Sequence, residues 1–95
     1  MKSRQTTNEQ ELQLASDLTK ALDTVHLQSY EEIAVKVRLK KGPLLYAAMK
    51  ALKDSNVVYE FLEHSHKMFV MQPNMKSVPI STQEVWVLGA LRGDL

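Results

Sequence analysis

The spacing of apolar residues changes partway along the chain, and this change limits the folds that 95 residues can adopt. Up to about residue 54 the apolar residues recur every three or four positions, which is the spacing of one face of a helix. Two short runs follow, 57–62 and 67–71, which are rich in β-branched and aromatic residues and flank a polar tip at 63–66. Such a pair is typical of a β-hairpin. Because helical spacing returns near the C-terminal end, the sequence predicts an α+β fold, mostly α, with one hairpin between helices.

Polar residues divide the first part into separate helices. Thr6 or Thr7 can begin a first helix that runs to about Val25. Ser29 and Glu32 have the spacing of a capping box, in which a side chain and a backbone N–H at each position satisfy one another. This pair predicts a short helix over about 30–38. The apolar stripe of the first helix contains Leu14, Leu18, Ala21, Leu22 and Val25, widened by Leu12 and Ala15.

A tight turn and two further helices complete the predicted elements. Gly42 suits a turn, and Pro43 is favourable as the first residue of a helix, because the missing N–H has no helical partner there. This helix ends near residue 54, where Asn56 is a candidate for a left-handed cap. After an irregular connector, the segment Ser81-Thr82-Gln83-Glu84 has the pattern of a third capping box, and it predicts a C-terminal helix over 81–92.

Charge is distributed unevenly, although the net charge is only +1. Residues 35–53 carry six basic residues and no acidic one, whereas residues 1–34 have three basic against six acidic residues and residues 54–95 have three against five. A basic block between acidic blocks can present one surface to a polyanion. The alternative interpretation is an ordinary solvated helix face.

Composition argues against several other classes of protein. The chain has no cysteine, so it has neither disulfides nor a cysteine metal site. No Gly-rich phosphate loop or paired-carboxylate motif stands out, so we do not expect an enzyme or a cofactor. His64 and His66 could share a strand face as metal ligands, but a solvated turn is the favoured interpretation.

The apolar runs are far shorter than the roughly 20 residues that span a bilayer, and the polar N-terminus lacks a signal-peptide pattern. We therefore expect a cytoplasmic protein without a membrane partner.

One stretch combines these features in a recognisable order. The cap at Ser29 is followed by the apolar pair Ile33-Ala34, and the helix after the turn has apolar anchors spaced by four and three, with another apolar pair just past its end. The anchors are Leu45, Met49 and Leu52, and the second pair is Val57-Val58. With the hairpin that follows, this stretch resembles the winged helix-turn-helix superfamily of DNA-binding proteins. The resemblance implies one winged-helix domain over 1–95, with the helix-turn-helix at 29–54, the wing at 57–71 and a C-terminal helix at 81–92.

The resemblance also implies a DNA-binding surface, because in this superfamily the second helix of the motif enters the major groove. The helix that starts at Pro43 would be inserted, and the turn before it would bind phosphate. The candidate DNA-binding residues are Lys36, Arg38, Lys40, Lys41, Leu44, Tyr46, Ala47 and Lys50, with His64, His66 and Lys67 on the wing. This expectation requires the lysines to face outward and to remain unpaired with the protein's own carboxylates.

The inserted helix departs from the usual pattern of the superfamily. It offers Leu44, Tyr46 and Ala47 where Arg, Asn, Gln or Ser usually read bases, so we expect binding of double-stranded DNA with modest sequence specificity. Small proteins that look like this one act as transcriptional regulators or as plasmid or phage replication or partition factors. The resemblance and the small core favour a homodimer through the N- and C-terminal helices. The alternative is a protein–protein interaction module that uses the apolar face of the inserted helix.

Overall fold

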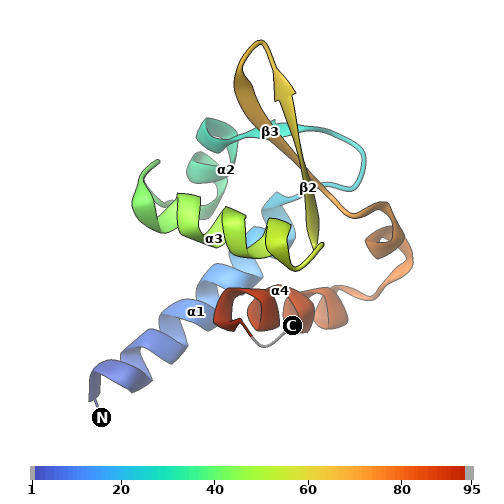
Figure 1. Ribbon diagram of the computed structural model, residues 1–95. Coiled ribbons are helices and arrows are strands. Elements are labelled where there is room, and N and C mark those ends of the chain that lie inside the picture. The colour runs from blue at the N-terminus through green and yellow to red at the C-terminus, as the bar shows by residue number, and fades with distance from the viewer. Residues whose placement is uncertain (1, 94–95) are drawn as a thin grey trace.

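The computed structural model describes residues 2–93, and the side chains of residues 9–93 (Figure 1). In chain order the elements are α1 (Lys2–Ala21), β1 (Gln28–Ser29), α2 (Tyr30–Val37), α3 (Pro43–Asp54), β2 (Val58–Glu63), β3 (His66–Met71), the 3-10 helix η1 (Pro73–Ser77) and α4 (Ile80–Arg92). The three strands form an antiparallel sheet in the order β1-β3-β2. The prediction of a mostly helical α+β fold is confirmed. Figure 1 shows the hairpin projecting at one end of the molecule, and α1 with α4 at the other.

The first helix is displaced from its predicted range at both ends. It begins at Lys2, so the expected start at Thr6 or Thr7 is wrong. It ends at Ala21, because the Asp23 carboxylate accepts a hydrogen bond from the Val25 backbone N–H at 2.8 Å, which turns the chain out of the helix. Val25 is 64% exposed and does not belong to the buried stripe.

The capping box at the start of α2 is confirmed in both of its hydrogen bonds. The Ser29 hydroxyl accepts from the Glu32 backbone N–H at 3.2 Å, and the Glu32 carboxylate accepts from the Ser29 N–H at 2.9 Å. The predicted helix over 30–38 ends one residue early, at Val37, because Arg38 adopts a left-handed backbone with φ 58°.

The sheet contains one strand that the sequence did not predict. Gln28 and Ser29 pair with Phe69 and Met68 of β3. Two residues are too few to give an alternating pattern, and Ser29 is also the helix cap, so local signals indicate only the helix. This short strand attaches the start of α2 to the sheet.

The hairpin is confirmed, but its tip is tighter than predicted. Glu63 and His66 are paired strand residues, so the expected four-residue tip at 63–66 is wrong. The connection consists of His64 and Ser65, with φ angles of 52° and 70°. Two consecutive left-handed residues match the right-handed twist of the flanking strands. Both side chains lie at the far end of the hairpin.

The third predicted capping box is wrong. The helix α4 begins at Ile80 with Pro79 as its N-cap residue, and no side chain caps it, so Ser81 lies inside the first turn. Gln83 points inward instead. Its buried side-chain amide donates to the backbone carbonyls of Met75 at 2.7 Å and Val78 at 2.8 Å. The glutamine at this position therefore fastens η1 to α4.

The core lies between the helices and one face of the sheet. Val58 of β2 and Phe69 and Met71 of β3 contribute to it, together with the inner faces of all four helices. The largest fully buried side chains are Phe69, Leu18, Ile33, Leu45, Met49, Leu52, Met71, Val58 and Val87. After α3, Asn56 has a φ of 61°, which confirms its predicted left-handed conformation.

Candidate nucleic-acid interface

The turn between α2 and α3 is held by one apolar anchor. The backbone N–H of Leu39 donates to the Ala34 carbonyl at 3.0 Å, and the Leu39 side chain packs against the core. Its two neighbours, Arg38 and Lys40, are exposed. Pro43 then opens α3, as predicted. The anchor therefore fixes the backbone of the turn while two basic side chains project from it.

Three of the six cations in the basic block have no carboxylate partner in the described part of the chain. They are Lys36, Arg38 and Lys40, and all three are exposed. Lys36 lies in the last turn of α2 and the other two follow in the turn, so the three are close in sequence around one helix end. This unpaired set is the strongest candidate for a phosphate-binding surface.

The other three cations are paired, so the expectation that the lysines remain free is wrong for Lys41, Lys50 and Lys53. Lys41 is hydrogen-bonded to Glu31 of α2, and Lys50 lies 2.6 Å from Asp54. Lys53 lies 3.4 Å from Glu60. The lysine side chains are between 45% and 74% exposed. Ion pairs this exposed add little to the stability of a protein, so a phosphate can replace the carboxylate at small cost.

The proton affinities of these groups reflect the pairing. The hydrogen bond from Lys41 lowers the pKa of the Glu31 carboxyl below its ordinary value, and the same bond raises the pKa of Lys41. The hydrogen bond to Asp54 likewise raises the pKa of Lys50. Each of these lysines therefore keeps its charge at neutral pH. An anion that binds to Lys41 or Lys50 has to compete with the carboxylate of Glu31 or Asp54.

The outer face of α3 carries the predicted contact residues. Leu44 is 63% exposed and Tyr46 is 40% exposed, while Ala47 and Lys50 are also exposed. The opposite face is buried through Leu45, Ala48, Met49 and Leu52. The predicted division of this helix into a core face and an outer face is therefore confirmed. The outer face is mainly apolar.

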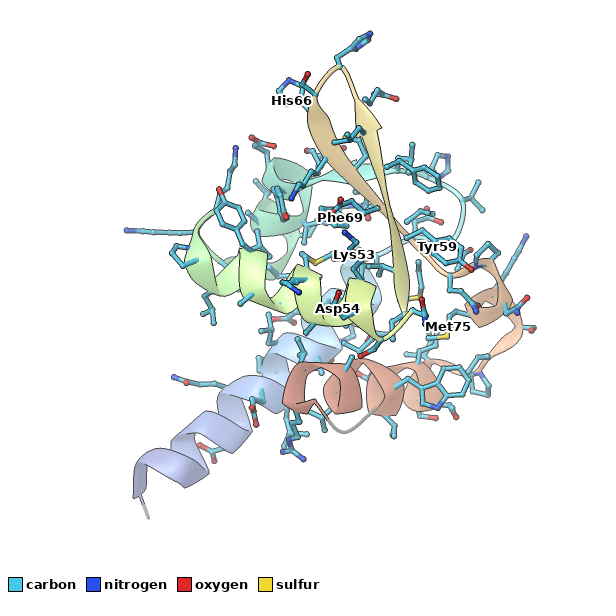
Figure 2. The ribbon with its side chains drawn as sticks, viewed as in Figure 1. Lys53, Asp54, Tyr59, His66, Phe69 and Met75 are labelled. Atoms are coloured by element: carbon cyan, nitrogen blue, oxygen red, sulfur yellow. The ribbon has the colours of Figure 1, made fainter. Side chains whose placement is uncertain are left out.

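The predicted wing residues lie in two different places. His64 and His66 are exposed at the tip of the hairpin, where Figure 2 shows His66 far from α3. Lys67 lies nearer the body, and its ammonium nitrogen is 4.0 Å from a Glu60 oxygen. Because Lys53 of α3 approaches the other oxygen of Glu60, the carboxylate connects α3 with the hairpin.

Sequence reasoning missed Tyr30, Lys53 and Glu60 as members of this surface. The ring of Tyr30 contacts Tyr46, with centroids 4.7 Å apart. Glu60 lies only 18% exposed between two lysines. No local pattern marks these residues, because each contact joins different elements and depends on how α3 packs beside the sheet.

Other kinds of site find little support in the described residues. Within residues 2–93, no three His, Asp or Glu side chains gather closely enough to hold a metal ion. None of the helices in that range combines the length and apolar character needed to cross a bilayer. Comparison with protein-family models, with curated proteins and with solved structures finds no match to this chain. Function is therefore inferred from the surface of the molecule.

Proposed function

We propose that this protein binds double-stranded DNA as a winged helix-turn-helix protein. The observation that carries the proposal is the exposed, carboxylate-free set Lys36, Arg38 and Lys40 at the turn that leads into α3. The dense negative charge of a DNA backbone attracts such a set, and counterions are released as each lysine or arginine neutralises a phosphate. Transcriptional regulation and plasmid or phage replication or partition are the roles we favour.

The order of the elements supports this class of protein. Two helices, α2 and α3, are joined by a tight turn and followed by a hairpin that pairs with the short strand β1. In such an arrangement α3 would lie in the major groove with the turn against the phosphates, and the hairpin tip would reach the flanking backbone.

Phosphate contacts dominate the binding that we propose. The outer face of α3 offers no Arg, Asn or Gln to base edges, and those residues make the bidentate contacts that distinguish one base pair from another. Leu44 and Ala47 can contact a thymine methyl group, and Tyr46 can donate to a phosphate or a base edge. Specificity is therefore modest, or it derives from DNA shape.

A salt series tests the proposal directly. Binding of a labelled duplex is measured by fluorescence polarisation at several salt concentrations for the wild type, Lys40→Ala and the control Lys76→Ala. We expect Lys40→Ala to weaken binding to any sequence and to reduce the slope of log K against log salt by about one. Lys76 lies on η1, outside the proposed surface, and its removal should leave the slope unchanged.

Lys41→Ala provides a finer comparison, because Lys41 is paired with Glu31. A phosphate must displace that carboxylate, so we expect a smaller loss of affinity than for Lys40→Ala. A wild-type protein that does not bind duplex DNA even at low salt contradicts the proposal, and so does a salt slope that Lys40→Ala and Lys41→Ala together leave unchanged.

We also propose a homodimer through α1 and α4. Apolar side chains remain exposed on these helices, namely Leu12 at 52%, Val85 at 64% and Trp86 at 41%. A second copy would cover them and would place two α3 helices for half-sites about one helical turn, roughly 34 Å, apart. Val85→Lys should shift the sedimentation of the protein toward the monomer, and unchanged sedimentation contradicts this interface.

A protein–protein interaction module is the second candidate, because the outer face of α3 borders an apolar hollow. Leu44 lines this hollow of about 440 Å³ together with Leu14, Val37 and Leu39. A partner helix with apolar residues would fit it. The two functions separate in one comparison, since Leu44→Lys should abolish protein docking but should preserve or strengthen binding to a polyanion.

A further inference from the structure

The outer edge of β2 is open, and the hydrogen bonds of the neighbouring strand β3 fix which backbone groups it exposes. The backbone N–H of Met71 donates to the Asp23 carbonyl at 2.7 Å, which lies away from β2. Val58 is the register partner of Met71. Because backbone groups alternate in direction along an antiparallel strand, the N–H and C=O of Val58, Glu60 and Leu62 all point outward from β2.

These six backbone groups have no partner among the described residues, because β2 is an edge strand. Natural proteins usually protect such an edge with charged side chains, especially lysine, with proline or with a bulge. The strand Val58–Glu63 contains neither lysine nor proline, and it pairs with β3 residue for residue without a bulge. Its charged residues are Glu63, next to the turn, and Glu60, which is paired with Lys53 and Lys67. It also exposes Tyr59 at 40%, Phe61 at 50% and Leu62 at 70%.

We propose that β2 pairs with β2 of a second copy of this chain, antiparallel and with the two-fold axis at Glu60. In this register Val58 faces the partner's Leu62, and Glu60 faces the partner's Glu60. Every outward N–H and C=O of the two strands is then satisfied, whereas a shift by two residues leaves some of them unpaired.

The side chains complement one another in the same register. On the outer face of the sheet, Tyr59 would lie opposite the partner's Phe61, and aromatic cross-strand pairs of this kind stabilise antiparallel strands. Figure 2 shows Tyr59 and Phe69 on opposite sides of the hairpin, so this aromatic contact lies away from the core. The two-fold axis generates it twice.

A hollow beside the edge matches the remaining apolar side chain. It has a volume of about 380 Å³ and is lined by Lys53, Asn56, Val58, Tyr59, Glu60 and Phe61. The partner's Leu62 would lie beside Val58 at this hollow. Leu62 is the most exposed apolar side chain of the strand, so pairing removes the largest apolar area that β2 presents to water.

Lysines beside Glu60 reduce the repulsion between carboxylates at the axis. Two Glu60 carboxylates would approach one another, and like charges directly opposite destabilise a sheet. Each carboxylate, however, already lies between Lys53 at 3.4 Å and Lys67 at 4.0 Å. Four ammonium groups would therefore surround two carboxylates, and the net charge at the axis is positive.

This contact uses a different element from the proposed α1–α4 interface, and the tip of the hairpin lies at the opposite end of the molecule from that helix pair (Figure 1). A protein with both contacts can join its dimers into rows. The β2 contact does not depend on DNA binding, so its test uses the protein alone.

The first experiment compares sedimentation of three chains that all carry Val85→Lys, so that the proposed α1–α4 contact is absent. They are the chain with wild-type Leu62, Leu62→Pro and Leu62→Ala, each measured over a series of protein concentrations. Proline removes the outward N–H at position 62 and leaves the ladder to β3 intact, which edge strands tolerate. We expect Leu62→Pro to associate at least tenfold more weakly than the chain with wild-type Leu62, and Leu62→Ala to lie between them. Equal association of the chain with wild-type Leu62 and Leu62→Pro overturns the proposal.

The second experiment reads the register and does not depend on the fold of the proline variant. Chains carrying Tyr59→Cys or Phe61→Cys are given tags of different mass and mixed under mild oxidation. Because the chain has no cysteine of its own, a disulfide joining the two different chains reports the pairing of position 59 with position 61. Preferential cross-linking of the mixture supports the proposal. Cross-linking no greater than that of either chain alone overturns it.

Discussion

The aromatic rings of Tyr30 and Tyr46 meet edge to face, with centroids 4.7 Å apart and ring planes at 63°. Tyr30 also lies 4.9 Å from the ring of Phe69, which is fully buried. The first residue of α2 therefore connects the exposed face of α3 with the sheet. Partial burial raises the pKa of the Tyr30 phenol, and the nearby Glu60 carboxylate and Tyr46 raise it further.

This shift predicts a loss of stability at alkaline pH. Since the folded protein holds the phenol proton more tightly than the unfolded chain does, the contribution of Tyr30 is fully present below the unfolded pKa near 10. It is lost as pH rises through the folded pKa. We expect Tyr30→Phe to lose less stability than the wild type between pH 8 and about pH 11. Urea unfolding at both pH values measures this, and identical losses would show that Tyr30 is not responsible.

The two serines that share a capping pattern should respond differently to alanine. Ser29→Ala removes a hydroxyl that accepts from Glu32, and we expect a loss of about 1 kcal/mol in the free energy of unfolding. Ser81 caps nothing, so Ser81→Ala should change stability by less than roughly 0.5 kcal/mol. Equal effects of the two substitutions in urea unfolding would contradict the assignment of the cap.

Adjacent leucines on α3 provide a matched test of its orientation. Leu45 is fully buried, so Leu45→Ala should cost roughly 2–5 kcal/mol because it leaves a cavity. Leu44 is 63% exposed, and Leu44→Ala should cost little. Thermal or urea unfolding of the two variants decides the matter, since a larger loss at Leu44 would mean that the helix is rotated.

The buried side-chain amide of Gln83 should contribute more to stability than an exposed glutamine does. Gln83→Leu keeps most of the volume but removes the side-chain donor to the carbonyls of Met75 and Val78. The Met75 carbonyl keeps its hydrogen bond from the Val78 N–H at 3.0 Å, so the Val78 carbonyl is the acceptor that loses its donor. Because buried unsatisfied acceptors are costly, we expect a loss of roughly 1–3 kcal/mol. The control is Gln10→Leu, at an exposed position of α1. Similar stability of the two variants would remove Gln83 from its proposed role.

The features that local chemistry determines were predictable from the sequence. Ser29 and Glu32 are three residues apart, and their two hydrogen bonds close within one helical turn. The same spacing does not give a cap at Ser81. Pro79 takes the N-cap position and the Gln83 amide is hydrogen-bonded to the Met75 carbonyl, so the helix starts at Ile80. Sequence spacing identifies a possible cap, whereas tertiary contacts decide whether it forms.

Contacts between elements were not predictable, and they change the interpretation of the basic block. Its six cations look equivalent in the sequence, yet Lys53 meets Glu60 only because α3 packs beside β2. Likewise, Lys41 meets Glu31 across ten residues. The sequence therefore located the basic surface but could not show which half of it is neutralised internally.

The hairpin ends in two left-handed residues, and neither His64 nor Ser65 is a glycine or an asparagine. A non-glycine residue in this conformation costs of order 1 kcal/mol, and an Asn-Gly pair would hold the same turn without strain. The tip therefore carries two imidazoles and a hydroxyl at a site where an inert turn would be more stable. Replacing His64-Ser65 with Asn-Gly should raise the melting temperature. The same replacement should weaken any contact that the tip makes through the side chains of His64 and Ser65.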